Sequence, residues 1–334
     1  MTLRIGLVGA GAVAGLHVQA AAQLPGIEVA AVCDIKPEAA RRLAGMAGAE
    51  AYTDVTQMLA SGLDAVIIMV PHALHAPMAL QAAEHGVHIL MEKPMATELA
   101  DCQRMIDACA RNHVCLAVGH VQRYLPDVRL AQEFLASGRI GAPVLIHNRR
   151  SVRYESGTRP DWFFDPVLAG GGVVMNIGTH AIDRSQFLAG SPARTVHART
   201  WRRPGFDVET DMTALIQMAN EVTVTVTVTS TGMPPGDETQ VICEDGALRM
   251  SHDDGLWWYQ RGQANLLLAP DEAHLREAFR LQLADFAACC AAGIEPASGG
   301  SYGQSVVAAA TAMYRSAATG ETVPVSISPW QVPA

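Results

Sequence analysis

Several features that mark whole classes of proteins are missing from this chain of 334 residues. Its seven cysteines are odd in number and scattered, and no two have the C-x-x-C spacing, which argues against a disulfide framework or a zinc cluster. No H-E-x-x-H or comparable spacing occurs, so we expect no metal site. The longest apolar runs are broken well short of a membrane span. Positive charge is also scarce, and a net charge of −9 argues against non-specific binding to nucleic acid or an anionic membrane, because both partners are negative.

The composition that remains is globular, with 49% hydrophobic and 17% charged residues. The length is sufficient for two domains and a large core. We see no internal repeat and no signal-peptide pattern, so the cytoplasm is the expected location.

The most informative segment lies at the N-terminus. An apolar strand, Leu3 to Val8, leads into Gly9-x-Gly11-x-x-Ala14, which has the G-x-G-x-x-G/A form of the dinucleotide fingerprint. Gly9 permits a tight turn, and Gly11 lets the backbone approach a pyrophosphate. The following helix, about Val13 to Gln23, would direct its N-terminal N–H groups at the phosphates. The turn residues expected to bind the cofactor are Gly9, Gly11, Ala12 and Val13.

A glycine turn alone is weak evidence, but here an acid follows at the right distance. A second strand, Glu28 to Cys33, ends at Asp34, 19 residues after Gly15, near the spacing expected for the carboxylate that binds the adenosine ribose. An aspartate at this position would repel a 2′-phosphate, which favours NAD. The positive charge of Lys36 would weaken that preference for NAD, so NADP remains an alternative.

Strand and helix patterns alternate through the first 120 residues, which indicates parallel βαβ units in a doubly wound sheet. Strands are expected at Arg4–Val8, Val29–Cys33, Ala65–Met69, His88–Met91 and Cys115–Val118. Helices are expected at Val13–Gln23, Pro37–Ala47, Asp54–Ser61, His75–His85 and Glu98–Asn112.

Beyond Gly119 strand signals dominate, so the second domain is expected to be α+β with a mostly antiparallel sheet. A helix, a strand, a polar and aromatic loop and another helix come first, at Val128–Ser137, Val144–Asn148, Ser151–Asp165 and about Val174–Leu188. Further strands are expected at Val196–Arg202, Met212–Met218, Val222–Thr229, Thr239–Cys243, Ala247–Ser251 and Leu256–Gln260. The strict alternation of Val222–Thr229 indicates one apolar and one polar face, and Glu244-Asp245-Gly246 is a hairpin signal. Helices at Ala273–Ala292 and Gly303–Thr319 end the chain.

These patterns predict a Rossmann domain over residues 1–121 and an α+β domain over 122–334, with room for the C-terminal helix to pack back on the first domain. Glu92, Lys93 and Pro94 fall at the carboxyl end of a predicted parallel strand, where ligands of such sheets bind. The previous strand ends in Val70-Pro71-His72, and His75 begins the next helix. We expect a functional Lys93 there rather than a solvated turn lysine. The cofactor-site residues expected at these strand ends are Pro71, His72, His75, Glu92 and Lys93.

A third group lies on the helix after Gly170, Gly171 and Gly172. Asn176, His180 and Asp183 are spaced i, i+4 and i+7, so one helix face would present all three. Histidine titrates near neutrality and is a common proton acceptor for alcohol oxidation. The preceding glycines would let the chain pass close to a bound ligand. The same pattern also fits a polar helix face packed under a sheet.

Polar and aromatic residues gather at the domain crossover and in the Ser151–Asp165 loop. They suit a hydroxylated or carboxylated ligand and equally a domain-interface rim. The residues expected to bind substrate are His120, Arg123, Tyr124, Arg153, Trp162, Asn176 and His180.

The order of these features resembles the Gfo/Idh/MocA oxidoreductase family, named after glucose–fructose oxidoreductase, inositol dehydrogenase and the MocA protein. The likeness spans nearly the whole chain, and Glu-Lys-Pro is its most specific signature. It is carried by the glycine turn with His17 after it, Asp34, Pro71 to His75, Glu92-Lys93-Pro94, Gly119-His120, Arg123-Tyr124, Gly138-Arg-Ile-Gly141, the three glycines, Gly178-x-His180-x-x-Asp183 and Tyr314 to Gly320.

The resemblance implies a Rossmann domain followed by an α+β domain, the substrate-binding and oligomerisation domain, whose open sheet often forms the subunit interface, hence a homodimer or homotetramer. It implies hydride exchange between a nicotinamide and a secondary alcohol or ketone of a sugar, cyclitol or related ring. Lys93 would contact substrate and cofactor, and His180 would be the acid/base. Two positions depart from the common pattern: Asn176 stands where many members have aspartate, and His72 where asparagine is common.

Three other functions stay open at this point. The same fold serves as a ketone reductase in the physiological direction, as an enzyme that uses bound NAD without net redox change, and as a nucleotide- or sugar-sensing protein without catalysis. The joint presence of Lys93 and His180 argues against the last.

Overall fold

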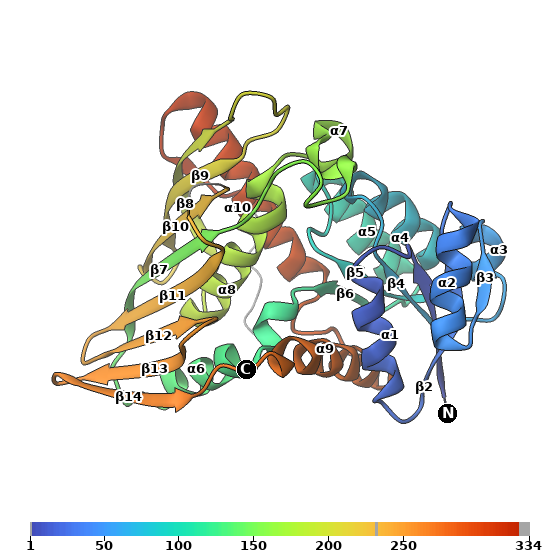
Figure 1. Ribbon diagram of the computed structural model, residues 1–334, viewed down its shortest axis with the longest axis horizontal. Helices are drawn as coiled ribbons and strands as arrows, with labels where there is room; N and C mark the ends of the chain where they lie inside the picture. The colour runs from blue at the N-terminus through green and yellow to red at the C-terminus, as the bar shows by residue number, and fades with distance from the viewer. Residues whose placement is uncertain (1, 231–232, 327–334) are drawn as a thin grey trace. The chain divides into compact units, whose positions relative to one another are not determined.

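The computed structural model describes residues 2–230 and 233–326, and the chain divides into two compact units (Figure 1). The first unit holds residues 1–121 and 275–304, and the second holds residues 122–274 and 305–334.

The first unit is built on six parallel strands in the order β3-β2-β1-β4-β5-β6. The strands are β1 (Leu3–Val8), β2 (Ile27–Cys33), β3 (Glu50–Tyr52), β4 (Ala65–Ile68), β5 (His88–Glu92) and β6 (Leu116–Gly119). The helices between them are α1 (Ala14–Ala22), α2 (Pro37–Ala47), α3 (Val55–Leu59), α4 (His75–Glu84) and α5 (Leu99–Arg111). The strand order reverses at β1, and such a reversal opens a ligand crevice outside the carboxyl ends of the strands. The predicted Rossmann fold is therefore confirmed.

The core of this sheet is apolar on both faces because helices cover both. Leu7, Val66, Ile67 and Ile68 are fully buried without any alternation. Burying an aliphatic side chain of this size contributes about 1.5–3 kcal/mol before the entropy cost of ordering it. The same burial fixes the strand ends that carry the polar residues described below.

The chain returns to the first unit late in the sequence. Helix α9 (Ala273–Ala292) belongs to this unit from Leu275 onward and lies beside α1 in Figure 1. Its Phe279 is 4% exposed and packs edge-on against His17, with ring centroids 4.9 Å apart. The Val118 N–H donates to the Ser298 carbonyl at 2.8 Å, so the segment after α9 borders β6. Helix α10 (Gly300–Thr319) begins in this unit and continues in the second.

The second unit is a nine-stranded sheet in the order β14-β13-β12-β11-β7-β10-β9-β8-β15. Its strands are β7 (Pro143–Ser151), β8 (Ala193–Trp201), β9 (Asp211–Met218), β10 (Thr223–Thr229), β11 (Gly236–Cys243), β12 (Ala247–Ser251), β13 (Gly255–Gln260), β14 (Gln263–Leu268) and β15 (Val323–Pro324). Among the described strand pairs of this second sheet, only β7–β10 is parallel, which confirms a mostly antiparallel sheet.

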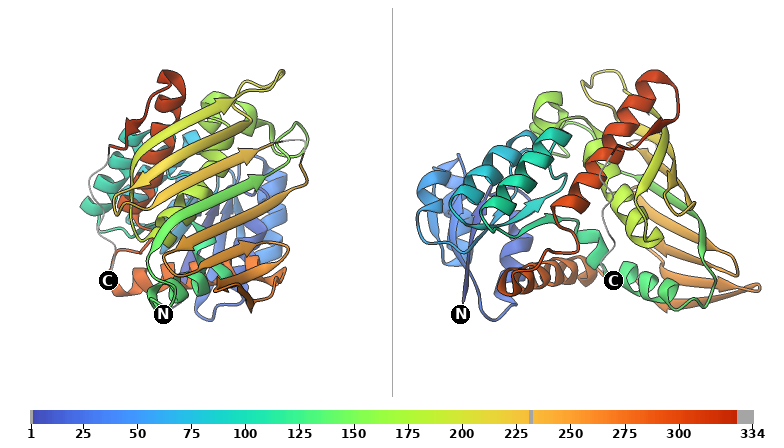
Figure 2. Two further views of the ribbon diagram at one scale, coloured as in Figure 1. Left: turned by 90° about the vertical axis from the view of Figure 1, so that its left-hand side faces the viewer. Right: turned by 180° about the vertical axis from the view of Figure 1, so that it is seen from behind.

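The valines of β10 are fully buried while its threonines are half-buried, as the alternation predicts. The expected hairpin joins β11 to β12, where the Cys243 N–H donates to the Gly246 carbonyl at 2.8 Å. The left view of Figure 2 shows one broad face of this sheet, over which no helix of the described residues lies.

Short helical segments complete the second unit. They are η2 (Val121–Tyr124), α6 (Pro126–Ala136), η3 (Asp161–Phe164), α7 (Pro166–Ala169), η4 (Val174–Gly178) and α8 (Thr179–Ala189). The expected single helix over 174–188 is different in the structure: its first turn, η4, is π-helical, with the Thr179 N–H bonded to the Val174 carbonyl. A π turn adds a residue to the turn, so the simple i, i+4, i+7 face does not run unbroken from Asn176. Within the part of the chain that the structure describes, no helix is both long and apolar enough to span a membrane.

Candidate active site

The glycine turn stands between β1 and α1, at the strand where the sheet order reverses. Gly9 has φ +99°, and a Cβ there would lie 2.6 Å from the Met69 carbonyl oxygen, so only glycine fits. A Cβ on Gly11 would meet nothing within 4 Å, which leaves open space against the backbone there. No described side chain caps the N-terminus of α1, so its N–H groups can receive a phosphate.

Asp34 is half-buried immediately after β2, and its carboxylate is held by two backbone groups. One oxygen accepts the Ala10 N–H at 2.8 Å, and the other accepts the Lys36 N–H at 2.9 Å. These bonds fix the carboxylate beside the glycine turn, because Ala10 belongs to that turn. The turn and Asp34 thus fit a dinucleotide with a free ribose 2′-hydroxyl. Lys36 itself is exposed.

The carboxyl end of β5 lies on the same edge of the sheet and carries Glu92 and Lys93. Glu92 accepts a hydrogen bond from His17 Nε2 at 3.1 Å, and His17 is fully buried. Burial alone would raise the pKa of Glu92, but the His17 hydrogen bond and the charges of His17 and Lys93 lower it below its usual value. Glu92 therefore stays ionised beside Lys93, which is half-buried. The Lys93-Pro94 peptide is cis.

His75 is buried between the segments that follow β4 and β5 and contacts a backbone carbonyl of each. It is 1% exposed, with Nδ1 2.8 Å from the Pro94 carbonyl oxygen and Nε2 2.9 Å from the Val70 carbonyl oxygen. Burial lowers the pKa of His75, against the two backbone hydrogen bonds, which raise it. A neutral imidazole donates one hydrogen bond, so one of the two carbonyls is its partner at a time. Its neighbour His72 is buried as well, with ring centroids 5.7 Å apart.

In the second unit, the helix that carries His180 is held by a residue that the sequence did not single out. The Glu209 carboxylate accepts the N–H groups of Gly172 and Val174 at 2.9 Å and the Tyr314 hydroxyl at 2.8 Å. It satisfies the free N–H groups at the start of η4 and complements the positive end of the helix dipole.

Two of the three glycines, Gly171 and Gly172, pack against other parts of the chain. A Cβ on Gly171 would lie 2.0 Å from the Tyr314 hydroxyl, and a Cβ on Gly172 would lie 1.9 Å from the Glu209 carbonyl oxygen. The chain passes close to its own side chains and backbone at these two positions, which accounts for glycine there, and the expected approach to a bound ligand stays a prediction.

We expect Glu209→Ala to lower the free energy of unfolding by about 1–3 kcal/mol, because two backbone donors and a buried hydroxyl lose their acceptor. Urea denaturation of the full chain measures this. The matched control is Glu221→Ala, whose partner Arg194 is half exposed, and its expected effect is within about 0.5 kcal/mol. Equal effects of the two variants would contradict the capping role.

Asn176 and His180 both lie in this capped segment. Asn176 is 3% exposed and lies beside Tyr154, whose hydroxyl donates to the Phe163 carbonyl at 3.0 Å and whose pKa is raised by burial to about 12. His180 is half-buried in the first turn of α8. Asp183, expected on the same face, is fully buried and pairs with Arg123 at 3.0 Å. Arg123 is 6% exposed and stabilises the fold through this pair, so its part in substrate binding stays a prediction.

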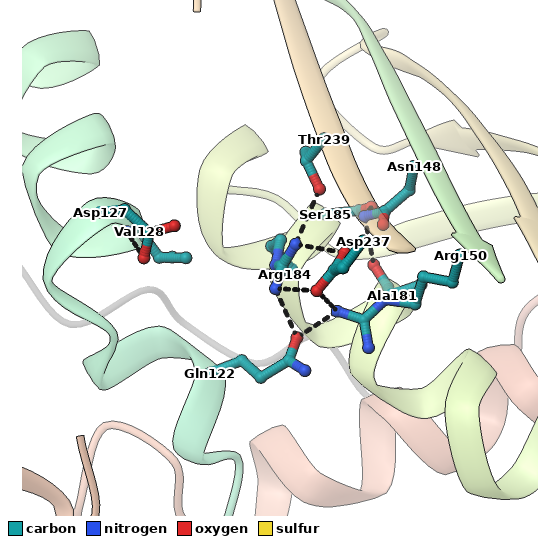
Figure 3. Close-up of polar contacts among 10 residues, drawn as sticks. All are labelled: Gln122, Asp127, Val128, Asn148, Arg150, Ala181, Arg184, Ser185, Asp237 and Thr239. Atoms are coloured by element: carbon teal, nitrogen blue, oxygen red, sulfur yellow. Dashed lines mark hydrogen bonds and ion pairs between the residues drawn. The ribbon is translucent and has the colours of Figure 1, made fainter. Parts of the chain in front are cut away.

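A second buried ion-pair network anchors α8 to the sheet (Figure 3). Asp237 accepts two hydrogen bonds from Arg184, each at 2.9 Å, and forms an ion pair with Arg150 at 3.0 Å. Gln122 Oε1 accepts from both arginines, and Thr239 accepts from Arg184 at 3.0 Å. Burial lowers the pKa of Arg150 to about 10, against the charge of Asp237. Because Arg184 lies on α8, the network fixes the helix of His180 on β7 and β11.

Of the remaining residues predicted to bind substrate, two are buried, one is half-buried and one is exposed. His120 is fully buried in the first unit, with its ring edge-on to Tyr302 at 5.6 Å, and Tyr124 is 9% exposed in the second unit. Arg153 is exposed, and Trp162 is half-buried and stacks on Phe163 at 3.8 Å. Their assignment to the substrate site stays a prediction.

Two family models of known proteins match successive parts of this chain. The family model described as "Oxidoreductase family, NAD-binding Rossmann fold" matches residues 3–120, and the "GFO/IDH/MocA C-terminal domain" matches residues 128–249. The chain belongs to the Gfo/Idh/MocA oxidoreductase family.

Two relatives of this oxidoreductase match it over nearly their full length. Inositol 2-dehydrogenase 4 of Saccharopolyspora erythraea is 28% identical, over 97% of this chain and 96% of its own. D-xylose 1-dehydrogenase (NADP(+)) 2 of Haloferax volcanii is 29% identical, over 96% of this chain and 99% of its own. A levoglucosan dehydrogenase solved with NADH shares the fold with a TM-score of 0.89, at 23% identity, over 98% of this chain and all of its own. The family match confirms the predicted NAD-binding domain and the predicted dehydrogenase class.

Proposed function

We propose that this protein oxidises a secondary alcohol of a sugar, cyclitol or related polyol with NAD. The observation that supports this most is the edge of the Rossmann sheet, where the open glycine turn, the fixed Asp34 carboxylate and Lys93 lie at the carboxyl ends of β1, β2 and β5. The named activities of the relatives, on inositol, xylose and levoglucosan, support a polyhydroxylated ring as substrate.

In the proposed reaction, the glycine turn and Asp34 would hold NAD, which would supply the acceptor for the hydride of the substrate carbon. Lys93 donates a hydrogen bond to the oxygen on that carbon, and its positive charge favours the ionised alcohol. Glu92, held ionised by His17, fixes the local charge beside Lys93. His180 accepts the hydroxyl proton on a ring nitrogen. Asn176, a neutral amide, orients His180 or binds a second hydroxyl.

A substrate screen tests this proposal. The purified protein is incubated with NAD or NADP and panels of inositols, aldoses, sugar acids and nucleotide sugars, and NAD(P)H is followed at equilibrium from both directions. Reduction of NAD by one class supports the proposal and identifies the substrate. An equilibrium that lies far toward the alcohol and NAD would favour the reductase. Absence of turnover with NAD demonstrably bound would favour a sensing role.

We expect Asp34→Ala to weaken binding of NAD more than binding of NADP. The carboxylate accepts the ribose hydroxyls of NAD but repels a 2′-phosphate, so its removal costs NAD a charge-assisted hydrogen bond, worth about 1.5–3 kcal/mol, and relieves NADP. Isothermal titration of both cofactors gives the two changes. Equal losses for NAD and NADP would contradict the ribose role.

We further propose that copies of this chain associate through the open face of the nine-stranded sheet, as a homodimer or homotetramer. Leu215 of β9 is 50% exposed on this face and lies opposite Thr225 of β10. Sedimentation equilibrium of the native protein and of Leu215→Glu tests the assignment, which requires the charged variant to shift toward monomer.

A further inference from the structure

The first unit contains a pocket on the edge of the sheet opposite the glycine turn. It has a volume of about 420 Å³. His88 and Leu116, which line it, are the first residues of β5 and β6, while the cofactor edge is formed by the carboxyl ends of the strands. The ends of α5 and α9 and the start of α10 complete its wall. Neither the proposed dehydrogenase chemistry nor the glycine turn uses this pocket.

Three cysteines from three separate segments line the pocket. Cys109 lies on α5, Cys115 immediately precedes β6, and Cys290 lies in the last turn of α9. All three are free thiols. The thiols of Cys115 and Cys290 are hydrogen-bonded to each other, and both residues are half-buried, whereas Cys109 is buried. A contact between thiols 175 positions apart in the sequence is a property of the fold that no local spacing indicates.

The surroundings of this thiol pair do not form a metal site. In the described ranges, no three His, Cys, Asp or Glu side chains are grouped so as to hold a metal ion. His88 Nδ1 accepts the Cys115 N–H at 3.0 Å, so this ring nitrogen carries no proton, and burial lowers the pKa of His88. The nearby imidazole is therefore neutral.

We propose that Cys115 and Cys290 form a reversible redox site that exchanges with small-molecule disulfides entering this pocket. In the first step the Cys115 thiolate attacks one sulfur of the disulfide, forms a mixed disulfide and releases one thiolate. In the second step Cys290, having lost its proton to solvent, attacks the Cys115 sulfur and releases the second thiolate. The two protein thiols are oxidised to one disulfide, and the small disulfide is reduced to two thiols. This site is independent of the proposed hydride transfer.

The order of attack follows from the hydrogen bond between the two thiols. The hydrogen bond from Cys290 lowers the pKa of Cys115, against burial and the carboxylates of Asp285 and Glu295, and the same bond raises the pKa of Cys290. Burial raises the pKa of Cys109 to about 12, so this third thiol of the pocket stays protonated. Since the thiolate is the nucleophile, Cys115 reacts first and Cys109 does not.

The test treats the full chain, reduced and then freed of reductant, with increasing oxidised glutathione. Intact mass, maleimide labelling and peptide mapping are the readouts. We expect the wild type to lose two free thiols and two hydrogens without a glutathione adduct, and to yield one linked pair of peptides containing Cys115 and Cys290. Cys290→Ser should retain one glutathione on Cys115, because the second attack is missing. Cys109→Ser, the matched control, should form the disulfide like the wild type.

Peptide mapping of the wild type needs no variant, so the proposal stays testable if a substitution prevents folding. Glutathione spread over several cysteines, a different linked pair, or unreacted Cys115 and Cys290 in the folded protein would each overturn the proposal.

Discussion

Lys93→Ala is expected to lower kcat about 10²–10⁴-fold, the range for loss of a positioned proton or hydrogen-bond donor at a reacting oxygen. The binding of NAD should remain nearly unchanged, because the glycine turn and Asp34 are intact. Lys93 and Lys36 are the only lysines in the chain, and Lys93 is the half-buried one, at the carboxyl end of a parallel strand. Stopped-flow turnover and NAD titration measure the two effects separately.

The control for Lys93 is Arg104→Ala, which removes a cation of the same unit from the exposed face of α5. It should leave both turnover and NAD binding as they are. If Lys93→Ala turned over normally with the substrate found in the screen, or lost NAD binding as strongly as turnover, its catalytic assignment would be wrong.

His180→Ala is the second large effect that we expect, again about 10²–10⁴-fold in kcat. The imidazole must be neutral to accept the hydroxyl proton, so alcohol oxidation by the native protein should fall in acid. The variant should lose that acid limb of the pH profile, while ketone reduction should show the opposite dependence. A structural role alone would lower the rate without removing the limb.

His147→Ala provides the matched control for His180. His147 is half-buried on β7 of the same unit, with Nδ1 2.6 Å from Thr225 Oγ1. Its loss should leave the acid limb in place. An unchanged pH profile in His180→Ala would show that another group accepts the proton.

The sequence predicts those parts of the fold that depend on local patterns. The glycine turn after β1, the alternation in β10 and the hairpin at Glu244–Gly246 are each encoded by neighbouring residues, and the structure contains all three. Strands β3, β14 and β15 were not predicted. β3 and β15 are three and two residues long, and most of β14 is exposed, so none has a clear apolar period.

The candidate site was less predictable because its supporting contacts join distant residues. Glu209 caps a helix that begins 35 positions before it, and Asp183 meets Arg123 across 60 positions. Neither partner lies near the other in sequence, so a charged residue in either place looks like solvated surface or a ligand contact. The positions of Lys93 and Asp34 at this edge could be predicted because each directly follows the end of a strand.

We propose, in short, that the substrate carbon transfers hydride to NAD, while Lys93 donates a hydrogen bond to the oxygen on that carbon and His180 accepts the hydroxyl proton. The most direct measurement uses the substrate from the screen, carrying deuterium on the carbon to be oxidised, with mass analysis of the cofactor. The account predicts deuterium in the NADH that forms and a slower rate than with the unlabelled compound, and Lys93→Ala should form the same labelled NADH about 10²–10⁴-fold more slowly. Product formed with unlabelled NADH, or with the cofactor returned as NAD, would contradict it.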